Sequence, residues 1–336
     1  MGLKTHIREG LNSLLKRFGY VMVDDRILYE WQKTSSHTKP GYKLSKLPEG
    51  AAGYLVKNNP RLGELQTRYA AFNAEVTAPL VWTETHVRPE DMLYFRGDNA
   101  YVWQVRERSM NILAYALTMY YVRSIDALGL LEKVEEDDSF GIHSFTVDNR
   151  WVSRDLLDSV TEMYFLEKHL NISTHTNLSV LDIGAGYGRL AHRMIRALPN
   201  ISQYLCTDAV PISTFICEYY LRFRNVEGKA HVVPLDDIDR TLSGRCVDIA
   251  INIHSFSECR PAAIAWWLSL LSKHSVRYLM IVPNSGDSLR TTEGADFTHI
   301  VEEHGYRLRA KEPKYRDPVV QQYAINPAYH YLFERR

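Results

Sequence analysis

The second half of the sequence alternates short apolar runs with stretches of helical spacing. The apolar runs predict strands at residues 179–183, 202–207, 231–233, 247–253, 276–282, 306–309 and 329–333. Helical spacing, twice opened by a proline at the first turn, predicts helices between them at residues 189–198, 211–223 and 262–272. Strands that alternate with helices in this way predict an α/β fold built on a mainly parallel sheet.

The first half is patterned mainly as helices. Apolar residues at helical spacing predict them at residues 3–18, 58–84, 101–128 and 154–170. Ser153 is the expected N-cap of the last of these helices. Residues 34–53 are rich in Ser, Thr, Pro, Gly and Lys, which predicts an exposed linker. We therefore divide the chain into a helical N-terminal region that covers the acceptor, residues 1–150, and an α/β domain, residues 151–336.

The first predicted helix has one apolar face. That face is formed by Leu3, Ile7, Leu11, Leu14, Leu15 and Phe18. Basic residues lie among the polar positions, at Lys4, Arg8, Lys16 and Arg17. Amphipathic helices mostly face a core, so we favour a helix that packs on its own protein or on a dimer mate. The alternative is a surface helix that contacts a membrane or a partner enzyme.

Three alternate glycines, Gly184, Gly186 and Gly188, follow the first predicted strand of the sheet. Glycine lets a ligand approach the backbone and permits a positive φ, and the next helix begins with free N–H groups that face such a ligand. Asp182 precedes them in a D-x-G-x-G-x-G pattern that resembles motif I of the S-adenosylmethionine-dependent methyltransferases. A dinucleotide fingerprint has Gly or Ala where this chain has Arg189.

Acidic residues follow the next two predicted strands. Asp208 lies 20 residues after Gly188, where a carboxylate can accept both ribose hydroxyls of an adenosine. NAD-dependent enzymes use the same arrangement, so Asp208 indicates a nucleoside without separating the two classes. Asp236 and Asp237 follow the third strand, where methyltransferases commonly place an acid near the adenine amine. Solvated loop acids are the alternative interpretation.

The fourth strand ends in a polar run that we expect at the ligand crevice, with Asn252 on the cofactor side. In the methyltransferase resemblance this run is the counterpart of motif IV, beside the transferable methyl group. A hydroxyl that accepts a methyl group must lose its proton, and a histidine with a pKa of about 6.5 suits that task at neutral pH. We predict His254 as the general base, oriented by Glu258. The alternative is that both side chains only hold the loop together.

A second polar run, FRGDNAYVWQ at residues 95–104, mixes hydrogen-bonding side chains with aromatic ones, as a polyol site requires. The residues that we predict to bind the acceptor are Arg96, Asn99, Tyr101 and Gln104, with Tyr315 near the C-terminus as part of a lid or wall. Capping of the following helix by Asp98 or Asn99 is the structural alternative.

Composition limits the partners and the location. Basic and acidic residues balance at 40 each, so no basic excess favours nucleic acid. The cysteines show no C-x-x-C or zinc spacing, and although Asp236, Asp237, Asp239 and Glu258 could hold Mg²⁺, nothing in their spacing demands it, so no metal site is predicted. The longest apolar run is far shorter than the ~20 residues that span a bilayer. We expect a cytoplasmic protein with reduced cysteines and no transmembrane segment.

Four strings together resemble a family of bacterial sugar O-methyltransferases. They are IHSFSE at 253–258, FRGDNAYVWQ at 95–104, SRDLLDS at 153–159 and KEPKYRDPVVQQY at 311–323. The resemblance implies a Rossmann-like class I methyltransferase sheet with an antiparallel last strand and S-adenosylmethionine as methyl donor. It also implies a sugar or glycosylated acceptor, used in polysaccharide, glycolipid or natural-product assembly. A homo-oligomer is compatible with the sequence.

Two rival functions stay open. A nicotinamide-dependent sugar oxidoreductase or epimerase would bind adenosine in the same way. Arg189, and the lack of a Tyr-x-x-x-Lys pair after the glycine loop, argue against that class. A methyltransferase-like scaffold that keeps the cofactor without turnover is the second rival. The complete glycine loop and Asp208 argue against it.

Overall fold

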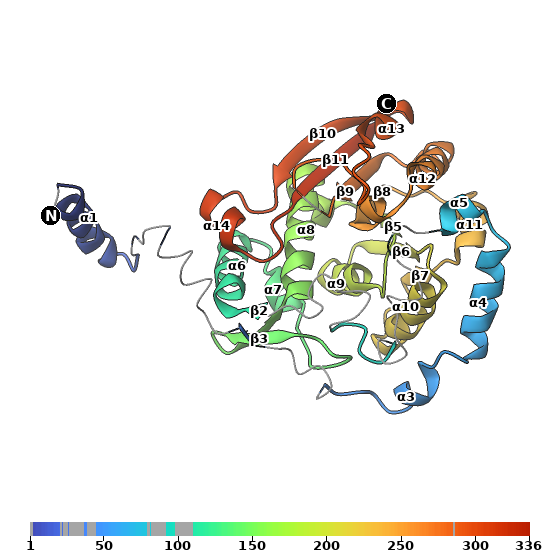
Figure 1. Cartoon of the computed structure of the whole chain (residues 1–336), viewed down its shortest axis with the longest axis horizontal. Coiled ribbons are helices and arrows are strands. Elements are labelled where there is room, and N and C mark those ends of the chain that lie inside the picture. Colours follow the sequence, from blue (N-terminus) through green and yellow to red (C-terminus); the bar gives the residue numbers. More distant parts are fainter. Residues whose placement is uncertain are drawn as a thin grey trace.

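The computed structural model describes residues 3–20, 22, 26, 37–38, 45–78, 81, 92–97, 110–284 and 286–336. Within them, a seven-stranded sheet forms the centre of the molecule (Figure 1). Its strands, in order across the sheet, are β10 (Tyr306–Pro313), β11 (Tyr329–Arg335), β9 (Tyr278–Val282), β8 (Ile249–Ile253), β5 (Leu178–Ile183), β6 (Ile201–Thr207) and β7 (Ala230–Val232).

The strand directions confirm the predicted sheet. From β7 to β9 all neighbours are parallel, whereas β11 is antiparallel to both β9 and β10. This order, with one reversed strand near an edge, is the Rossmann-like class I methyltransferase sheet that the sequence predicts. The chain leaves β5 toward β7 and later resumes at β8 on the other side of β5. The carboxyl ends of β5 and β8 therefore form a topological switch point, where open α/β sheets bind ligands.

Helices cover both faces of the sheet. α9 (Arg189–Ala197) and α10 (Pro211–Phe223) connect β5, β6 and β7, and α12 (Pro261–Lys273) connects β8 to β9. Parallel crossovers are right-handed, and these two parts of the chain cross the sheet in opposite directions, so α12 lies on the face opposite α9 and α10. α8 (Arg154–Leu170) packs on α9, and α13 (Thr298–Glu303) packs on α12. The predicted limits of α8, α9 and α10 are correct to within one residue.

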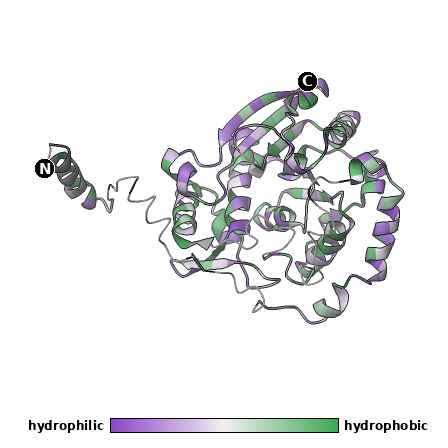
Figure 2. Cartoon of the chain, viewed as in Figure 1, coloured by the Kyte–Doolittle hydropathy of each residue, from purple (hydrophilic) through white to green (hydrophobic). Residues whose placement is uncertain are grey.

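The predicted helix at 58–84 is two shorter helices among the described residues, α4 (Pro60–Ala70) and α5 (Ala74–Thr77). It breaks at Asn73, whose side chain caps α5 by accepting from the Glu75 backbone N–H at 3.0 Å. α4 packs on α10 and α5 packs on α12, so this segment passes around the β7 edge of the sheet and covers it. In Figure 2, α4 is largely hydrophilic in colour, as expected of an outer helix.

Between residues 101 and 153 the structure differs from the sequence analysis in two respects. The helix predicted at 101–128 is α6 (Ile112–Ile125), and residues 101–109 lie outside the described chain. A hairpin of β3 (Ser144–Val147) and β4 (Arg150–Ser153) was missed. Its two turn residues, Asp148 and Asn149, both have positive φ, 48° and 60°. A two-residue hairpin turn needs such φ values and usually takes them from glycine, so this Asp-Asn turn was not recognised.

The remaining elements are short. They are α3 (Ala51–Tyr54), α7 (Leu130–Lys133), α11 (Ile238–Leu242), α14 (Pro318–Tyr323), the 3-10 helices η4 (Ile172–Thr174), η5 (Leu235–Asp237) and η6 (Ser255–Glu258), and β1 (His37–Thr38) paired with β2 (Met110–Asn111). One continuous cluster of buried side chains runs from Ala51 to Phe333. The N-terminal helices thus share a core with the sheet, and the domain division at residue 150 stays a prediction.

α1 (Leu3–Lys16) forms as predicted, but its apolar face stays exposed in the described part of the chain. Ile7, Leu11, Leu14 and Phe18 are 62%, 42%, 52% and 71% exposed. In Figure 1 this helix lies apart from the rest of the described chain. The interpretation that docks this apolar face on the body of its own chain is therefore wrong.

Candidate functional site

A pocket lies at the carboxyl ends of β5, β6 and β8, at the switch point of the sheet. It is bounded by the glycine loop, the segments after β6 and β8, and the first turns of α8, α9 and α10. The predicted site residues that line it are Asp182, Gly184, Gly186, Asp208, His254 and Glu258. The topology thus brings together residues from three separate stretches of sequence.

The glycine loop presents bare backbone to this pocket. Gly184, Gly186 and Gly188 have φ values of 75°, 57° and 85°, which L residues rarely adopt. A Cβ on Gly184 would lie 2.2 Å from Ser255 Oγ, so a side chain there would displace the segment after β8. A Cβ on Gly188 would lie 2.9 Å from Cys217 Sγ, so this glycine lets α9 pack closely on α10.

Asn252 connects the start of the glycine loop to the segment after β8 by hydrogen bonds. It is fully buried, and its Nδ2 donates to the carbonyl of Ile183 at 3.0 Å and to Ser255 Oγ at 2.6 Å. Its Oδ1 accepts from the Phe256 backbone N–H at 2.9 Å. These bonds hold the end of β5 against the end of β8. Asn252 is not among the pocket-lining residues, and its predicted contact with the cofactor stays a prediction.

Asp208 follows β6 and is held at the pocket by backbone N–H groups. Its Oδ2 accepts from Gly186 at 3.0 Å and its Oδ1 from Val210 at 2.8 Å. Burial raises the pKa of Asp208 to about 7; both hydrogen bonds oppose this rise, and the nearby Glu258 carboxylate adds to it. The glycine loop and the acid are therefore one hydrogen-bonded unit whose charge changes near neutral pH.

Asp182 lies under the same loop at the end of β5. It is 4% exposed, and Tyr204 Oη donates to its Oδ2 at 3.0 Å. Burial raises its pKa to about 7, although the hydrogen bond from Tyr204 opposes the rise. The site thus contains two acids that titrate near neutrality.

His254 follows β8 in a left-handed conformation, with φ at 67°. Its Nδ1 lies 3.2 Å from the carbonyl oxygen of Pro283. Because a carbonyl can only accept, Nδ1 carries the proton and Nε2 keeps its lone pair. Burial and, to a smaller extent, the cation of Arg154 lower the pKa of His254 to about 3. The imidazole is therefore neutral at neutral pH, but it is a weaker base than the ordinary histidine pKa led us to expect.

Glu258 ends the 3-10 helix η6 and is 4% exposed. Its Oε1 accepts from Asn284 Nδ2 at 2.8 Å. This bond ties the segment after β8 to the segment after β9. The proposed orientation of the His254 ring by Glu258 stays a prediction.

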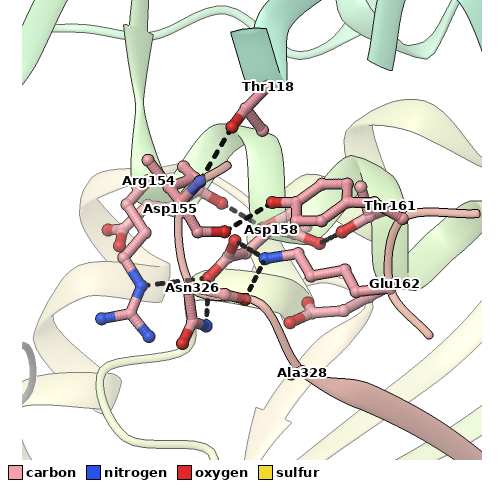
Figure 3. Close-up of polar contacts among 12 residues, drawn as sticks. Thr118, Arg154, Asp155, Asp158, Thr161, Glu162, Asn326 and Ala328 are labelled. Atoms are coloured by element: carbon pink, nitrogen blue, oxygen red, sulfur yellow. Dashed lines mark hydrogen bonds and ion pairs between the residues drawn. The ribbon is translucent and has the colours of Figure 1, made fainter. Parts of the chain in front are cut away.

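The first turns of α8 contribute pocket residues to which the sequence analysis gave no role. Arg154, Asp155 and Asp158 all line the pocket. Arg154 Nε donates to Asp158 Oδ2 at 3.1 Å, while its two terminal nitrogens have no hydrogen-bond partner in the described part of the chain (Figure 3). Asp155 accepts from Tyr187 Oη, and Lys314 bonds to Asp158. The run SRDLLDS carried the family resemblance, and its i,i+4 Arg-Asp spacing was the available signal.

Arg189 stands where a dinucleotide fingerprint has its third glycine, and its side chain connects α9 to α8. Its Nη1 and Nη2 both lie 2.9 Å from the carboxylate of Glu162, and Nη1 also donates to Ser159 Oγ at 2.7 Å. This fork fixes the first residue of α9 relative to α8. The residue that argued against a dinucleotide fingerprint has a structural function here.

The acids predicted near the adenine are engaged by α4 instead. Arg68 Nε and Nη2 donate to Asp236 at 2.8 and 2.9 Å, and Nη2 donates to Asp237 at 2.7 Å. Tyr69 Oη, one residue on, lies 2.8 Å from Thr214 Oγ1 and accepts from the Leu235 backbone N–H. Neither acid is among the pocket-lining residues, and their contact with the adenine stays a prediction.

The predicted acceptor residues that the structure describes also lie away from the pocket lining. Arg96 is 1% exposed and is paired with Glu136 and, at 2.6 Å, with Asp137. Tyr315 is fully buried and its hydroxyl donates to the carbonyl of Ile325 at 2.6 Å. Asn99, Tyr101 and Gln104 lie outside the described residues, and their role stays a prediction.

Within the described ranges, no group of three or more His, Cys, Asp or Glu side chains is placed to hold a metal ion. The sequence matches no protein-family description and no curated protein sequence.

Solved structures show distant likeness. A SAM dependent methyltransferase from Aquifex aeolicus is 15% identical with a TM-score of 0.40, covering 52% of this chain and 89% of that one. Magnesium protoporphyrin IX methyltransferase from Synechocystis PCC 6803, with bound SAM, is 13% identical with a TM-score of 0.40, covering 66% and 97%. The (4+2)-cyclase SpnF is 15% identical with a TM-score of 0.39, covering 66% and 93%. At this distance the likeness assigns no function, and the fold assignment rests on the strand order.

Proposed function

We propose that this chain is an S-adenosylmethionine-dependent methyltransferase. The observation that carries the proposal is one pocket that combines a bare glycine loop, the buried carboxyl group of Asp208 and the guanidinium group of Arg154. The donor has three matching polar parts: a ribose with two hydroxyls, an amino acid carboxylate and a sulfonium cation. The pocket offers a counterpart for each part: Asp208 for the hydroxyls, Arg154 for the carboxylate, and carboxylates such as those of Asp155 and Glu258 for the cation.

Each part of the donor would have its own partner. The ionised carboxylate of Asp208 would accept hydrogen bonds from the ribose hydroxyls. The two terminal nitrogens of Arg154, which lack partners among the described residues, would bind the amino acid carboxylate. The backbone at Gly184 and Gly186, which lines the pocket, would lie against the donor. When bound, S-adenosylmethionine supplies an electrophilic methyl group on a positively charged sulfur.

We further propose that the acceptor is a hydroxyl group of a sugar or glycosylated molecule. His254 Nε2 would take the proton that the hydroxyl releases, and the ring can do so because it is neutral with Nδ1–H held by Pro283. Trp267 lines the same pocket and offers an aromatic face, and Glu258 offers an acceptor oxygen. The sugar specificity rests on the resemblance of the four sequence strings.

The donor is tested first, by calorimetric titration of the purified protein with S-adenosylhomocysteine and, separately, with NAD. We expect micromolar binding of the first and none of the second. Arg154→Gln should weaken S-adenosylhomocysteine binding by about 10-fold or more, the value of a hydrogen bond to a charged group. Arg150→Gln is the matched control, because Arg150 lies four residues earlier and pairs with the exposed Glu132. Binding of NAD alone would overturn the proposal.

The base is tested separately with His254→Asn. Asparagine tolerates the left-handed backbone at this position and can still donate to Pro283, but it cannot take a proton. Turnover on a panel of glycosides, nucleotide-linked sugars and simple alcohols should fall by about 10²- to 10⁴-fold, with donor affinity unchanged. Retained turnover would remove His254 as the base without touching the donor assignment. Donor binding without turnover on any acceptor would favour the scaffold function.

A further inference from the structure

The apolar face of α1 has no role in the function proposed above. Ile7, Leu11 and Leu14 follow one another at steps of four and three residues, which places them on one side of the helix, and Phe18 follows in the turn after it. All four are exposed, from 42% at Leu11 to 71% at Phe18. A continuous apolar stripe of this kind on a monomer marks an interaction surface.

α1 also lacks the packing that usually stabilises a helix. It is 14 residues long, a length at which isolated helices are marginal in water. Gly10 stands in its interior, where glycine is a poor helix former, and no other part of the described chain comes within 4 Å of a Cβ placed there. The segment therefore gains most of its helical stability only when its apolar face is covered.

The charge of the segment indicates what covers that face. Between residues 3 and 18 the sequence carries Lys4, Arg8, Lys16 and Arg17 against the single acid Glu9. Two such helices packed face to face would bring like charges together, which disfavours a second copy of this chain. A negatively charged surface attracts the same cations.

We propose that α1 binds the surface of an anionic lipid bilayer, with its apolar stripe in the headgroup region. Basic residues around an apolar face and aromatic side chains at the end of the helix suit that boundary, and Phe18 and Tyr20 are 71% and 68% exposed. α1 lies in the plane of the bilayer, since no helix in the described ranges is long and apolar enough to cross a membrane. This inference is independent of the methyl transfer proposed above.

The test is sedimentation of the full chain with vesicles of phosphatidylcholine alone and of phosphatidylcholine with phosphatidylglycerol. We expect binding to the anionic vesicles only, weakened by salt. Leu14→Glu and Ser13→Glu form a matched pair, because both add one acid at neighbouring exposed positions and only Leu14 lies on the apolar stripe. Ser13→Glu should lower vesicle binding by about 5-fold, and Leu14→Glu by at least about 50-fold.

Three outcomes would overturn the proposal. Failure of the full chain to bind anionic vesicles would remove the lipid surface as the occupant. Equal losses in the two variants would show that charge alone acts and that the stripe does not insert. A dimer that forms without vesicles and dissociates in Leu14→Glu, seen by analytical ultracentrifugation, would assign the stripe to a second copy. Both variants should keep the thermal midpoint of the parent, which shows that the body of the protein is intact.

Discussion

Asp182 and Asp208 give the glycine loop a charge that depends on pH. Burial raises the pKa of each to about 7, well above the ordinary aspartate value. A raised carboxyl pKa stabilises the folded state in acid, and that stability is lost as the pH rises through about 7. Above that pH the free protein holds two buried carboxylates next to the loop. A ligand that donates hydrogen bonds to Asp208 compensates for this charge.

Donor affinity should therefore depend on pH. A ribose hydroxyl donates its proton in a hydrogen bond, so the ionised form of Asp208 is the form that binds. The dissociation constant of S-adenosylhomocysteine, measured by calorimetry, should rise as the pH falls below 7 and approach about tenfold per pH unit.

The matched variants assign this dependence to one residue. Asp208→Asn should bind weakly at every pH, with the dependence gone, whereas Asp182→Asn should keep the dependence because Asp182 bonds to Tyr204 below the loop. An affinity that is flat across neutral pH in the parent would contradict the role given to Asp208.

The site shows which residue properties sequence can predict. The glycines, Asp208 and His254 were found because each follows a strand, and parallel strands end at the same edge of a sheet. The low pKa of His254 was not foreseeable, because it arises from burial and from Arg154, 100 residues earlier in the chain. Asp236 was placed by the same reasoning as Asp208, yet Arg68 of α4 engages it. Strand position therefore predicts where a side chain lies but not its partner.

A buried ion network ties the helix after the glycine loop to the N-terminal region. Glu136 lies between α7 and β3 and is paired with Arg96 and, at 2.9 Å, with Arg193 of α9. The Glu136 and arginine side chains are at most 2% exposed. Burial alone would raise the pKa of Glu136, but Arg193 and Arg96 lower it to about 2. The carboxylate is therefore charged at neutral pH and holds two buried cations.

Removal of this charge should unfold the protein more readily. Glu136→Gln leaves Arg193 buried without its anion and leaves Arg96 with Asp137 alone, so the free energy of unfolding from urea titration should fall by about 3–5 kcal/mol at neutral pH. The difference from the parent should shrink as the pH falls through about 2, because below that pH Glu136 is protonated in both the folded and the unfolded state. Glu132→Gln is the control, since Glu132 is 82% exposed and its pair with Arg150 is worth at most about 1 kcal/mol. Equal losses in the two variants would refute the network's role.

The elements of the α/β domain were predictable because their patterns are local. α8, α9 and α10 each have a cap, a loop glycine or an opening proline at the predicted start, and the central strands β5, β8 and β9 are mostly apolar. The elements before residue 153 were harder. The β3–β4 hairpin depends on positive φ at Asp148 and Asn149, and the start of α5, which breaks the predicted helix, depends on a side-chain cap at Asn73. The exposure of α1 was not predictable, since amphipathic spacing does not say what the apolar face meets.

The C-terminal segment, residues 314–328, connects the reversed strand β11 to the pocket. Between β10 and β11 it crosses α6 and α8, where Thr118 Oγ1 accepts from the Ile325 backbone N–H at 3.0 Å. Lys314, which is 2% exposed, pairs with Asp158 of α8, and Asn326 Nδ2 donates to the same carboxylate at 3.2 Å (Figure 3). Burial alone would raise the pKa of Asp158, but Lys314 and Arg154 hold it below its ordinary range. Asp158 thus pairs both with Lys314 of the C-terminal segment and with Arg154 at the pocket.

Loss of Lys314 should therefore affect both stability and donor binding. In Lys314→Met the buried carboxylate of Asp158 loses one of its two ion-pair partners and keeps Arg154, so the free energy of unfolding should fall by about 3–5 kcal/mol at neutral pH. The loss should shrink in acid, because the stability that a lowered carboxyl pKa supplies disappears as that carboxyl is protonated. The same change draws Arg154 toward Asp158, so S-adenosylhomocysteine should bind more weakly.

Lys168→Met is the control for this prediction, because Lys168 lies near the C-terminal end of α8, is 39% exposed and pairs with Glu312. It should lower the free energy of unfolding by no more than about 1 kcal/mol and leave donor affinity unchanged. Urea titration at neutral and acidic pH, followed by calorimetry on the folded variants, separates the two effects. Lower stability in Lys314→Met with unchanged donor affinity would show that Asp158 supports the segment alone and does not set the charge of Arg154 in the pocket.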